Sequence, residues 1–302
     1  MFSKLLSQST KKRNFFAATR RSLNIFNSMI KTRLNQYIAQ KHSWLCVGLD
    51  PDMEKIPSLF LNCAEPVLEF MRAVVRATAE WAVAYKPNFA FYEALGLKGL
   101  RALEAIMMEF PKQVISIADA KRADIGNTSR LYAKAFFETW GFDAVTVPPY
   151  MGYDSIEPFL AYKEKLSFVL CLTSNRGAED FEERKLQSGE RLYEAVLHKA
   201  NEWNQFGNVG LVAGATRAEA LQKIRQAAPE LCLLIPGIGA QGGSLADAVR
   251  YGVDKEKASA VINISRALIY PEGEYKTISA FEQAVAKRAE EHVHQMRQAL
   301  CG

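Results

Sequence analysis

The 302-residue sequence lacks the features that define several protein classes. Its five cysteines are scattered and contain no Cys-x-x-Cys pair, which excludes a disulfide scaffold and fits a reducing compartment. Its apolar runs fall well short of the ~18 residues that a membrane span needs, so no membrane partner is predicted. Two of its four histidines, His292 and His294, lie two apart on a predicted helix and face different ways. The sequence therefore predicts no histidine-rich metal site.

Acidic residues are absent from positions 1–49, which hold nine lysines and arginines. The remainder carries the other 29 basic residues against all 33 acidic ones, a net charge of −4. The basic balance therefore comes from the N-terminus and does not indicate a nucleic-acid partner. Residues 1–30 are predicted to be a basic extension, either disordered, preceding a true start at Met29, or an Arg-rich organelle-targeting segment. Residues 31–302 are predicted to form one domain, expected in the cytoplasm, with an organelle as the alternative.

Short apolar runs alternate with amphipathic stretches along the rest of the chain. Near-continuous hydrophobic runs are typical of parallel strands that are covered on both faces. The eight runs are 44–50, 82–87, 113–119, 143–148, 167–173, 208–213, 231–236 and 260–265. The helical stretches include 65–81, 97–109, 128–140, 190–205, 217–227, 243–251 and 277–299. Eight such repeats predict an α/β fold, a single-domain (β/α)8 TIM barrel. A doubly wound sheet is the rival, but no Gly-x-Gly-x-x-Gly follows the first run.

Polar residues gather where the predicted strands end. Active sites of such barrels lie at the carboxyl ends of the strands, so these side chains should meet at one face. They are Asp50, Lys86, Asp119, Lys121, Thr173, Ser174, Asn175 and Arg266. The sequence therefore predicts that a single polar site lies over the barrel.

The densest cluster is Asp-Ala-Lys-Arg-Ala-Asp at 119–124. Residues two apart on an extended strand share a side, so Asp119 and Lys121 should point the same way, with Lys86 on the neighbouring strand. A salt-bridge network that closes the barrel is one interpretation. Buried ion pairs add little stability, however, and charges at strand ends more often mark chemistry. Catalysis is therefore the favoured interpretation.

A glycine-rich turn at 237–243 follows the seventh run, and Arg266 follows the eighth. Backbone N–H groups, a helix N-terminus and an arginine together bind phosphate well. These barrels bind phosphate with the loops that follow strands seven and eight. The pattern predicts a phosphate site there.

Seven motifs, in order, lie between residues 46 and 270. They are CVGLDPD (46–52), YKPNFAFYEALG (85–96), DAKRADIGNTSR (119–130), VPPYMGYDSIEPF (147–159), LTSN (172–175), PGIGAQGG (236–243) and NISRALIY (263–270). With them the chain resembles the orotidine 5′-phosphate decarboxylase family, in its longer, bacterial-type branch. The resemblance implies conversion of orotidine 5′-phosphate to UMP and CO2 in de novo pyrimidine biosynthesis, without a cofactor or metal, by a homodimer.

The resemblance also implies roles for individual residues. The charged tetrad would be Lys86, Asp119, Lys121 and Asp124, with Lys121 as the proton donor. Asp124 would reach into the partner's site, with Ile125 and Thr128 beside it. Substrate contacts would come from Asp50, Lys86 and Asn88 to the ribose, Thr173 or Ser174 to the pyrimidine, and Gly239, Gln241 and Arg266 to the phosphate. The family usually continues Pro-Gly after Asn175, where this chain has Arg176-Gly177.

Two other functions stay open at this point. One is a related phosphosugar lyase, such as a metal-dependent keto-gulonate phosphate decarboxylase, which would need further carboxylates near Asp119. The other is a non-catalytic nucleotide-binding barrel, which would need Arg266 but not alternating lysines and aspartates. A decarboxylase without a cofactor must stabilise its carbanion by electrostatics, and the alternating charges suit that task.

Overall fold

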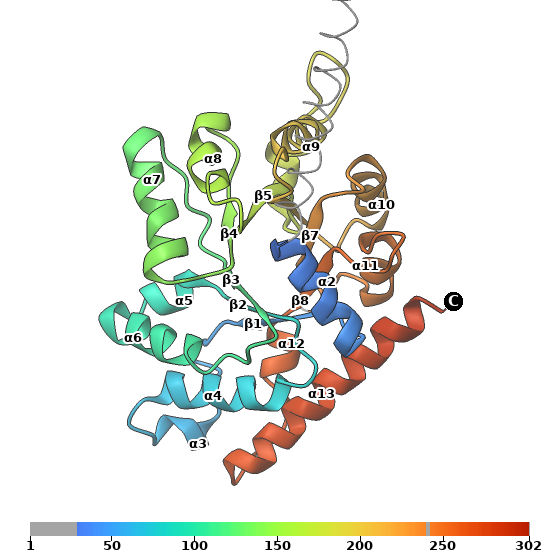
Figure 1. The fold of residues 1–302 in the computed structure, drawn as a ribbon. Helices are drawn as coiled ribbons and strands as arrows, with labels where there is room; N and C mark the ends of the chain where they lie inside the picture. Colours follow the sequence, from blue (N-terminus) through green and yellow to red (C-terminus); the bar gives the residue numbers. More distant parts are fainter. Residues whose placement is uncertain (1–28, 240–241, 302) are drawn as a thin grey trace, which may run out of the picture.

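The computed structural model describes residues 29–239 and 242–301. Within them, eight parallel strands close into a barrel in sequence order, and helices surround it (Figure 1). The strands are β1 (Leu45–Leu49), β2 (Ala84–Pro87), β3 (Ile115–Ala118), β4 (Ala144–Val147), β5 (Leu166–Leu172), β6 (Val209–Ala213), β7 (Cys232–Ile235) and β8 (Ala260–Ile264). Each lies inside or within one residue of a predicted run, so the predicted (β/α)8 barrel is confirmed.

The strands are almost entirely buried because both of their faces are covered. Every strand residue is buried except Leu170 in β5. The ladder closes where Cys46 of β1 pairs with Ala84 of β2 on one side and with Asn263 of β8 on the other. A register shift between Leu170 and Leu172 interrupts the pairing of β5 with β6. Parallel closure brings the carboxyl ends of all eight strands to one face of the molecule.

The helices follow the predicted order. They are α2 (Met29–Lys41), α3 (Ser58–Leu61), α4 (Pro66–Thr78), α5 (Phe89–Glu93), α6 (Gly96–Met107), α7 (Gly126–Lys134), the π-helix η1 (Ala135–Thr139), α8 (Tyr153–Leu160), the 3-10 helix η2 (Arg176–Asp180), α9 (Leu192–Trp203), α10 (Ala218–Ala227), α11 (Leu245–Gly252), α12 (Arg266–Ile269) and α13 (Ile278–Ala299). Sequence patterns did not single out α8, which contains Pro158, or the short α5. None of the helices in these residues has both the length and the apolar character needed to cross a membrane.

Helix α2 covers the amino-terminal end of the barrel. Three of its side chains reach chain segments that precede three different strands. Lys31 donates to the carbonyl of Glu230 before β7, Arg33 pairs with Asp143 before β4, and Lys41 donates to Ala82 before β2. Figure 1 shows α2 crossing the ring of strands. The predicted basic extension lies outside the described residues, except that Met29 and Ile30 begin this helix.

A buried arginine also fastens this end of the barrel. Arg225 of α10 donates to the carbonyls of Gly252 at 2.7 Å, Leu231 at 2.8 Å and Ser259 at 3.0 Å. Burial lowers the pKa of Arg225 from its ordinary value. Buried carbonyls need hydrogen-bond donors, and this one guanidinium supplies them to carbonyls in the loops that lead into β7 and β8.

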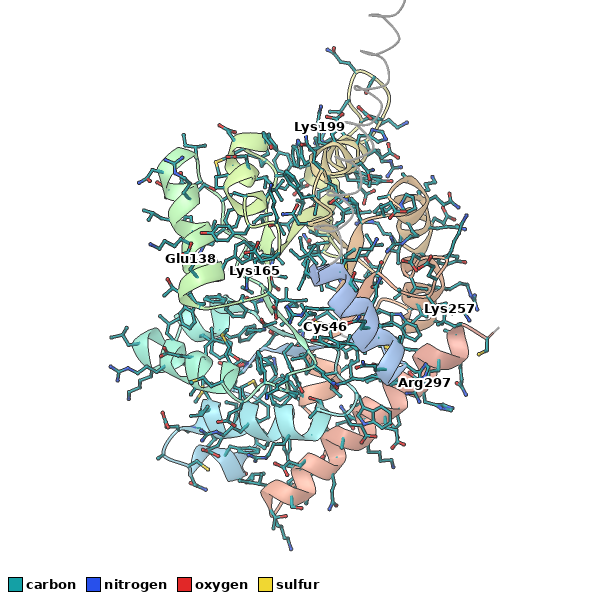
Figure 2. All side chains as sticks on the ribbon, in the orientation of Figure 1. Cys46, Glu138, Lys165, Lys199, Lys257 and Arg297 are labelled. Atoms are coloured by element: carbon teal, nitrogen blue, oxygen red, sulfur yellow. The ribbon has the colours of Figure 1, made fainter. Side chains whose placement is uncertain are left out.

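Helix α13 closes the ring against α4. Phe281 of α13 meets Phe60 and Phe70 with ring centroids 5.1 and 5.6 Å apart. Near the other end of α13, Arg297 donates to the carbonyls of Lys41 and His42. Figure 2 shows Arg297 on this last helix and Cys46 inside the barrel. Helix α13 is thus held to α3 and α4 near its start and to the end of α2 near its own end.

Candidate active site

A cavity of about 290 Å³ opens at the carboxyl ends of the strands. Nine of the polar residues predicted from the sequence line it: Asp50, Lys86, Asn88, Asp119, Lys121, Thr173, Ser174, Asn175 and Arg266. Thr146, Leu170, Val212, Leu234, Pro236, Gly237, Ile238, Asn263 and Ser265 complete the lining. The structure therefore brings side chains from strand ends around the whole ring to one hollow.

Asp119 is the hub of the charged cluster. Its Oδ2 pairs with Lys86 Nζ at 2.7 Å, and its Oδ1 pairs with Lys121 Nζ. The Lys86 and Asp119 side chains are 5% and 11% exposed, whereas Lys121 is 47% exposed and faces the cavity. An extension of the β2–β3 ladder between Asn88 and Asp119 holds the two strand ends together. Lysine, aspartate and lysine thus follow one another along the cavity wall.

Mutual pairing fixes the charge states of the two buried members. Burial alone would raise the pKa of Asp119, but Lys86 and Lys121 outweigh it and hold that pKa far below its ordinary value. Burial likewise disfavours the charge on Lys86, yet Asp119 and Asp50 raise its pKa above the ordinary value. Both groups are therefore ionised at neutral pH.

A fourth side chain, from β4, supports this cluster. Thr146 donates to Asp119 Oδ1 at 3.2 Å and accepts hydrogen bonds from the backbone N–H groups of Ala120 and Lys121. Lys121 has a φ of +48°, in the left-handed region that non-glycine residues rarely adopt. The turn that carries Lys121 is thus held from the neighbouring strand.

Asp50 directly follows β1 and lines the same cavity. Its Oδ2 accepts a 2.6 Å hydrogen bond from Ser265, while its buried Oδ1 has no protein partner in the described part of the chain. Gly48 makes this contact possible, because a Cβ there would lie 2.5 Å from that of Ser265. Tyr270 donates to the carbonyl of Asp50 at 2.9 Å and so fixes the loop. A carboxyl oxygen with spare acceptor capacity suits a ligand hydroxyl.

The end of β5 is held by a residue that the sequence patterns did not reveal. Glu182 accepts hydrogen bonds from both the backbone N–H and the hydroxyl of Thr173. Arg217, in turn, donates to the carbonyl of Thr173 at 3.3 Å. Thr173 is therefore occupied by protein groups, and Ser174 is the second cavity-lining hydroxyl at this edge.

The glycine-rich turn lies beside Arg266, as predicted, but only part of it lines the cavity. Gly237 and Ile238 line it, whereas Gly239, with φ of +76°, lies just outside the lining. A Cβ on Gly239 would also come within 3.0 Å of the side chain of Ala267. Gln241 lies outside the described residues. Arg266 begins α12 and supplies the cationic side of this edge.

Asp124 and Thr128 are not brought into the cavity of their own chain. The Asp124 carboxylate accepts a hydrogen bond from the N–H of Ile125 at 2.8 Å, just before α7. Thr128 is exposed on the first turn of that helix. Their predicted roles therefore depend on a second copy of the chain.

Two polar cavity residues within strands were missed by sequence reasoning, Thr146 in β4 and Asn263 in β8. Asn263 accepts a 3.6 Å contact from the buried thiol of Cys46, whose pKa burial raises to about 12. A polar residue inside an otherwise apolar run was the available signal. In the described residues, no group of three or more His, Cys, Asp or Glu side chains is placed to hold a metal ion.

Comparison with known proteins gives a consistent result. A sequence profile of the orotidine 5′-phosphate decarboxylase / HUMPS family matches residues 43–280. An orotidine 5′-phosphate decarboxylase of Christiangramia forsetii is 47% identical over 277 residues, which cover 90% of this chain and 99% of that protein. Another from Parabacteroides distasonis is 47% identical over 278 residues, covering 91% and 96%.

Solved structures agree. A putative orotidine-monophosphate decarboxylase from Toxoplasma gondii superimposes with a TM-score of 0.78 at 34% identity, covering 90% of this chain and 99% of that one. Leishmania donovani UMP synthase also gives 0.78, at 39% identity, over 89% of this chain and 56% of that one. The barrel, the charged cluster and the matched length converge, and the chain belongs to the orotidine 5′-phosphate decarboxylase family.

Proposed function

We propose that this chain converts orotidine 5′-phosphate to UMP and CO2, the step that completes pyrimidine nucleotide synthesis. The observation that carries the proposal is the Lys86–Asp119–Lys121 cluster at the wall of the cavity. The names of the relatives, which match nearly their whole length, support the same reaction. A nucleotide-binding barrel without catalysis would have no use for two lysines around one aspartate.

The cavity suits a phosphorylated nucleoside. We place the phosphate at Arg266 and the backbone around Gly237, because an arginine beside glycine N–H groups binds a dianion. The ribose hydroxyls lie at Asp50 Oδ1, which has no protein partner in the described residues, and at Lys86. The pyrimidine edge meets Ser174, which leaves the reacting carbon over Lys121.

Lys121 supplies the proton in this scheme. The bond between the ring carbon and the carboxylate breaks, its electron pair stays on the ring carbon, and CO2 leaves. A proton then moves from Lys121 Nζ to that carbon, and solvent restores the ammonium. A positive charge at the site of the developing carbanion stabilises it, and the same group acts as the general acid.

Asp119 assists by repelling the substrate carboxylate. Two unit negative charges ~4 Å apart repel by roughly 4 kcal/mol at an effective dielectric constant of ~20. That repulsion disappears as CO2 leaves. Enzymes typically supply ~8–23 kcal/mol, so the rest must come from phosphate and ribose contacts that hold the reacting groups together.

A second copy of the chain completes the site in this proposal. Ile125, which directly precedes α7, is 57% exposed, and Leu131 on α7 is 58% exposed. Both are close in sequence to Asp124. Tyr150 and Met151, in the loop before α8, add further exposed apolar surface. Large apolar side chains gathered around one edge are typical of an interface. Homodimerisation there would carry Asp124 and Thr128 into the partner's cavity.

The cysteine usage and the basic N-terminal residues bear on where the protein is located. We infer a cytoplasmic enzyme, in line with its cysteine usage, and an organelle enzyme if residues 1–30 direct import. N-terminal sequencing of the native protein distinguishes the two, because import by a cleaved segment would remove those residues.

The experiment that tests the activity is direct. The purified full chain, dialysed against EDTA, is mixed with orotidine 5′-phosphate, and loss of substrate absorbance is followed together with UMP formation. We expect UMP to form with EDTA present and not to form with Lys121→Ala. Turnover that required added Mg²⁺ would favour the phosphosugar-lyase alternative. Binding of UMP without turnover would favour a non-catalytic barrel.

A further inference from the structure

The strained backbone of Lys121 needs a physical explanation. Four non-glycine residues in the described part of the chain have a positive φ, and of these only Lys121 lines the cavity. Side chains rarely tolerate this region, so such a conformation persists only where its surroundings enforce it. The position of Lys121 Nζ therefore depends on whatever holds this turn.

The hydroxyl of Thr146 is placed to enforce the turn. It accepts hydrogen bonds from the N–H groups of Ala120 at 3.2 Å and Lys121 at 3.1 Å. It also donates to Asp119 Oδ1 at 3.2 Å, the carboxylate oxygen that pairs with Lys121. A hydroxyl has one proton and two lone pairs, so all of its hydrogen-bonding capacity is used. One buried side chain thus fixes both the backbone of Lys121 and its counter-ion.

The contacts of Thr146 are confined to this part of the site. The three hydrogen-bond partners of its hydroxyl belong to residues 119–121, and none belongs to Asp50 or Arg266 at the opposite wall. The side chain is 1% exposed and sits within β4, so its position is set by the barrel. Its removal should therefore disturb proton transfer more than ligand binding.

We propose that Thr146 is a positioning residue for proton transfer, holding Lys121 in its left-handed turn so that Nζ points at the reacting carbon. This inference rests on the proposed decarboxylase function. Thr146 exchanges no proton with substrate and acts through Lys121 and Asp119. Removing its hydroxyl leaves two N–H groups without an acceptor and Asp119 with one donor fewer.

The test compares Thr146→Val, which keeps the shape and loses the hydroxyl, with Thr146→Ser, which keeps the hydroxyl. For Thr146→Val we expect kcat to fall about 100-fold, the size of effect that a misplaced reacting group produces. The Kd for UMP should stay within about threefold of the parent, and Thr146→Ser should recover kcat to within about threefold.

Ser167→Ala is the matched control. Ser167 is also a buried strand hydroxyl, its residue pairs with Val145 in the β4–β5 ladder, and its Oγ has no partner in the described part of the chain. Its kcat should equal that of the parent. A loss in Ser167→Ala as large as in Thr146→Val would assign the effect to general packing and overturn the inference. If Thr146→Val does not fold, Thr146→Ala replaces it with the same expectations.

The outcomes separate the inference from the function on which it rests. If the parent turns over substrate and Thr146→Val keeps kcat within about threefold, the positioning role is wrong and the function stands. If the parent is inactive, the proposed function is wrong, and crystal structures of the two proteins decide the rest. We expect Lys121 to leave the positive-φ region in Thr146→Val. An unchanged turn with the Lys121–Asp119 pair intact would overturn the inference.

Discussion

Cationic side chains lie at both ends of the barrel, but they are hydrogen-bonded by different kinds of acceptor. At the amino-terminal end, Arg225 is surrounded by backbone carbonyls that cannot move away. At the carboxyl end, Lys86 and Lys121 share one carboxylate, Asp119, beside a cavity. A guanidinium held by main-chain acceptors stabilises the loops around it. Two ammonium groups around one aspartate leave donors for a ligand, since each carries three.

The partners of a buried cation therefore indicate its role better than its residue type does: backbone carbonyls indicate a structural role, and a shared carboxylate beside a cavity indicates a functional one. Substitutions at the amino-terminal end should change stability and leave turnover alone. Substitutions at the carboxyl end should change turnover or substrate affinity with smaller effects on stability. Substitutions at both ends of the barrel test that division.

The largest effect is expected from Lys121→Ala. Without its general acid the enzyme should lose kcat by about 10³-fold or more, because proton transfer alone typically contributes 10²–10⁴. Its affinity for UMP, measured by calorimetry, should be largely kept, and its Tm should not fall. Lys199→Ala, which changes an exposed lysine on α9, is the control (Figure 2). A kcat within about tenfold of the parent would remove Lys121 as the proton donor.

At the opposite end, Arg225→Met should lower stability by about 3 kcal/mol, because several buried carbonyls lose a charged donor. That loss corresponds to a fall in Tm of about 6–12 °C, measured by scanning calorimetry. The kcat of the folded fraction should match the parent. An unchanged Tm, or a folded protein with impaired turnover, would break the division between the two ends.

Arg266→Ala should weaken substrate capture. A charged hydrogen bond to phosphate contributes about 1.5–3 kcal/mol, so KM for orotidine 5′-phosphate should rise about 10–100-fold. Orotidine, which lacks the phosphate, is the matched control substrate and should show no difference between parent and variant. Equal losses with both substrates would place Arg266 outside the phosphate site.

The smallest effect concerns acid stability. Although burial opposes it, pairing with Lys86 and Lys121 holds the pKa of Asp119 far below its ordinary value. The stability from this ionised carboxylate is therefore present above the unfolded pKa of ~3.9 and is lost as pH falls. Relative to Asp119→Asn, the parent's advantage in thermal unfolding should be constant from about pH 5 to 7. It should shrink below ~4, by at most about 1.4 kcal/mol per pH unit. A constant advantage down to pH 3 would contradict the pairing.

Much of this arrangement could be predicted from the sequence. Near-continuous apolar runs identify buried parallel strands, and eight of them in alternation with helices leave few folds other than a closed barrel. Asp50, Lys86 and Arg266 were found because polar residues directly after apolar runs must lie at the same face. Local sequence patterns are enough to predict those site residues that lie at the carboxyl end of a strand.

Other parts of the site required the folded chain. Thr146 and Asn263 lie within apolar runs, and barrel closure decides which alternate residues face the interior. Glu182 lies nine positions beyond Thr173, in a loop whose path no periodicity fixes. Nor does any local pattern show that Asp124 stays out of the cavity lining of its own chain.

The most direct test of the account is a crystal structure of the chain with UMP bound. The account predicts the base over the lysine–aspartate cluster, with Lys121 Nζ within about 3–3.5 Å of the ring carbon that receives the proton, and the phosphate against Arg266. A base bound away from Lys121 and Asp119 would contradict it.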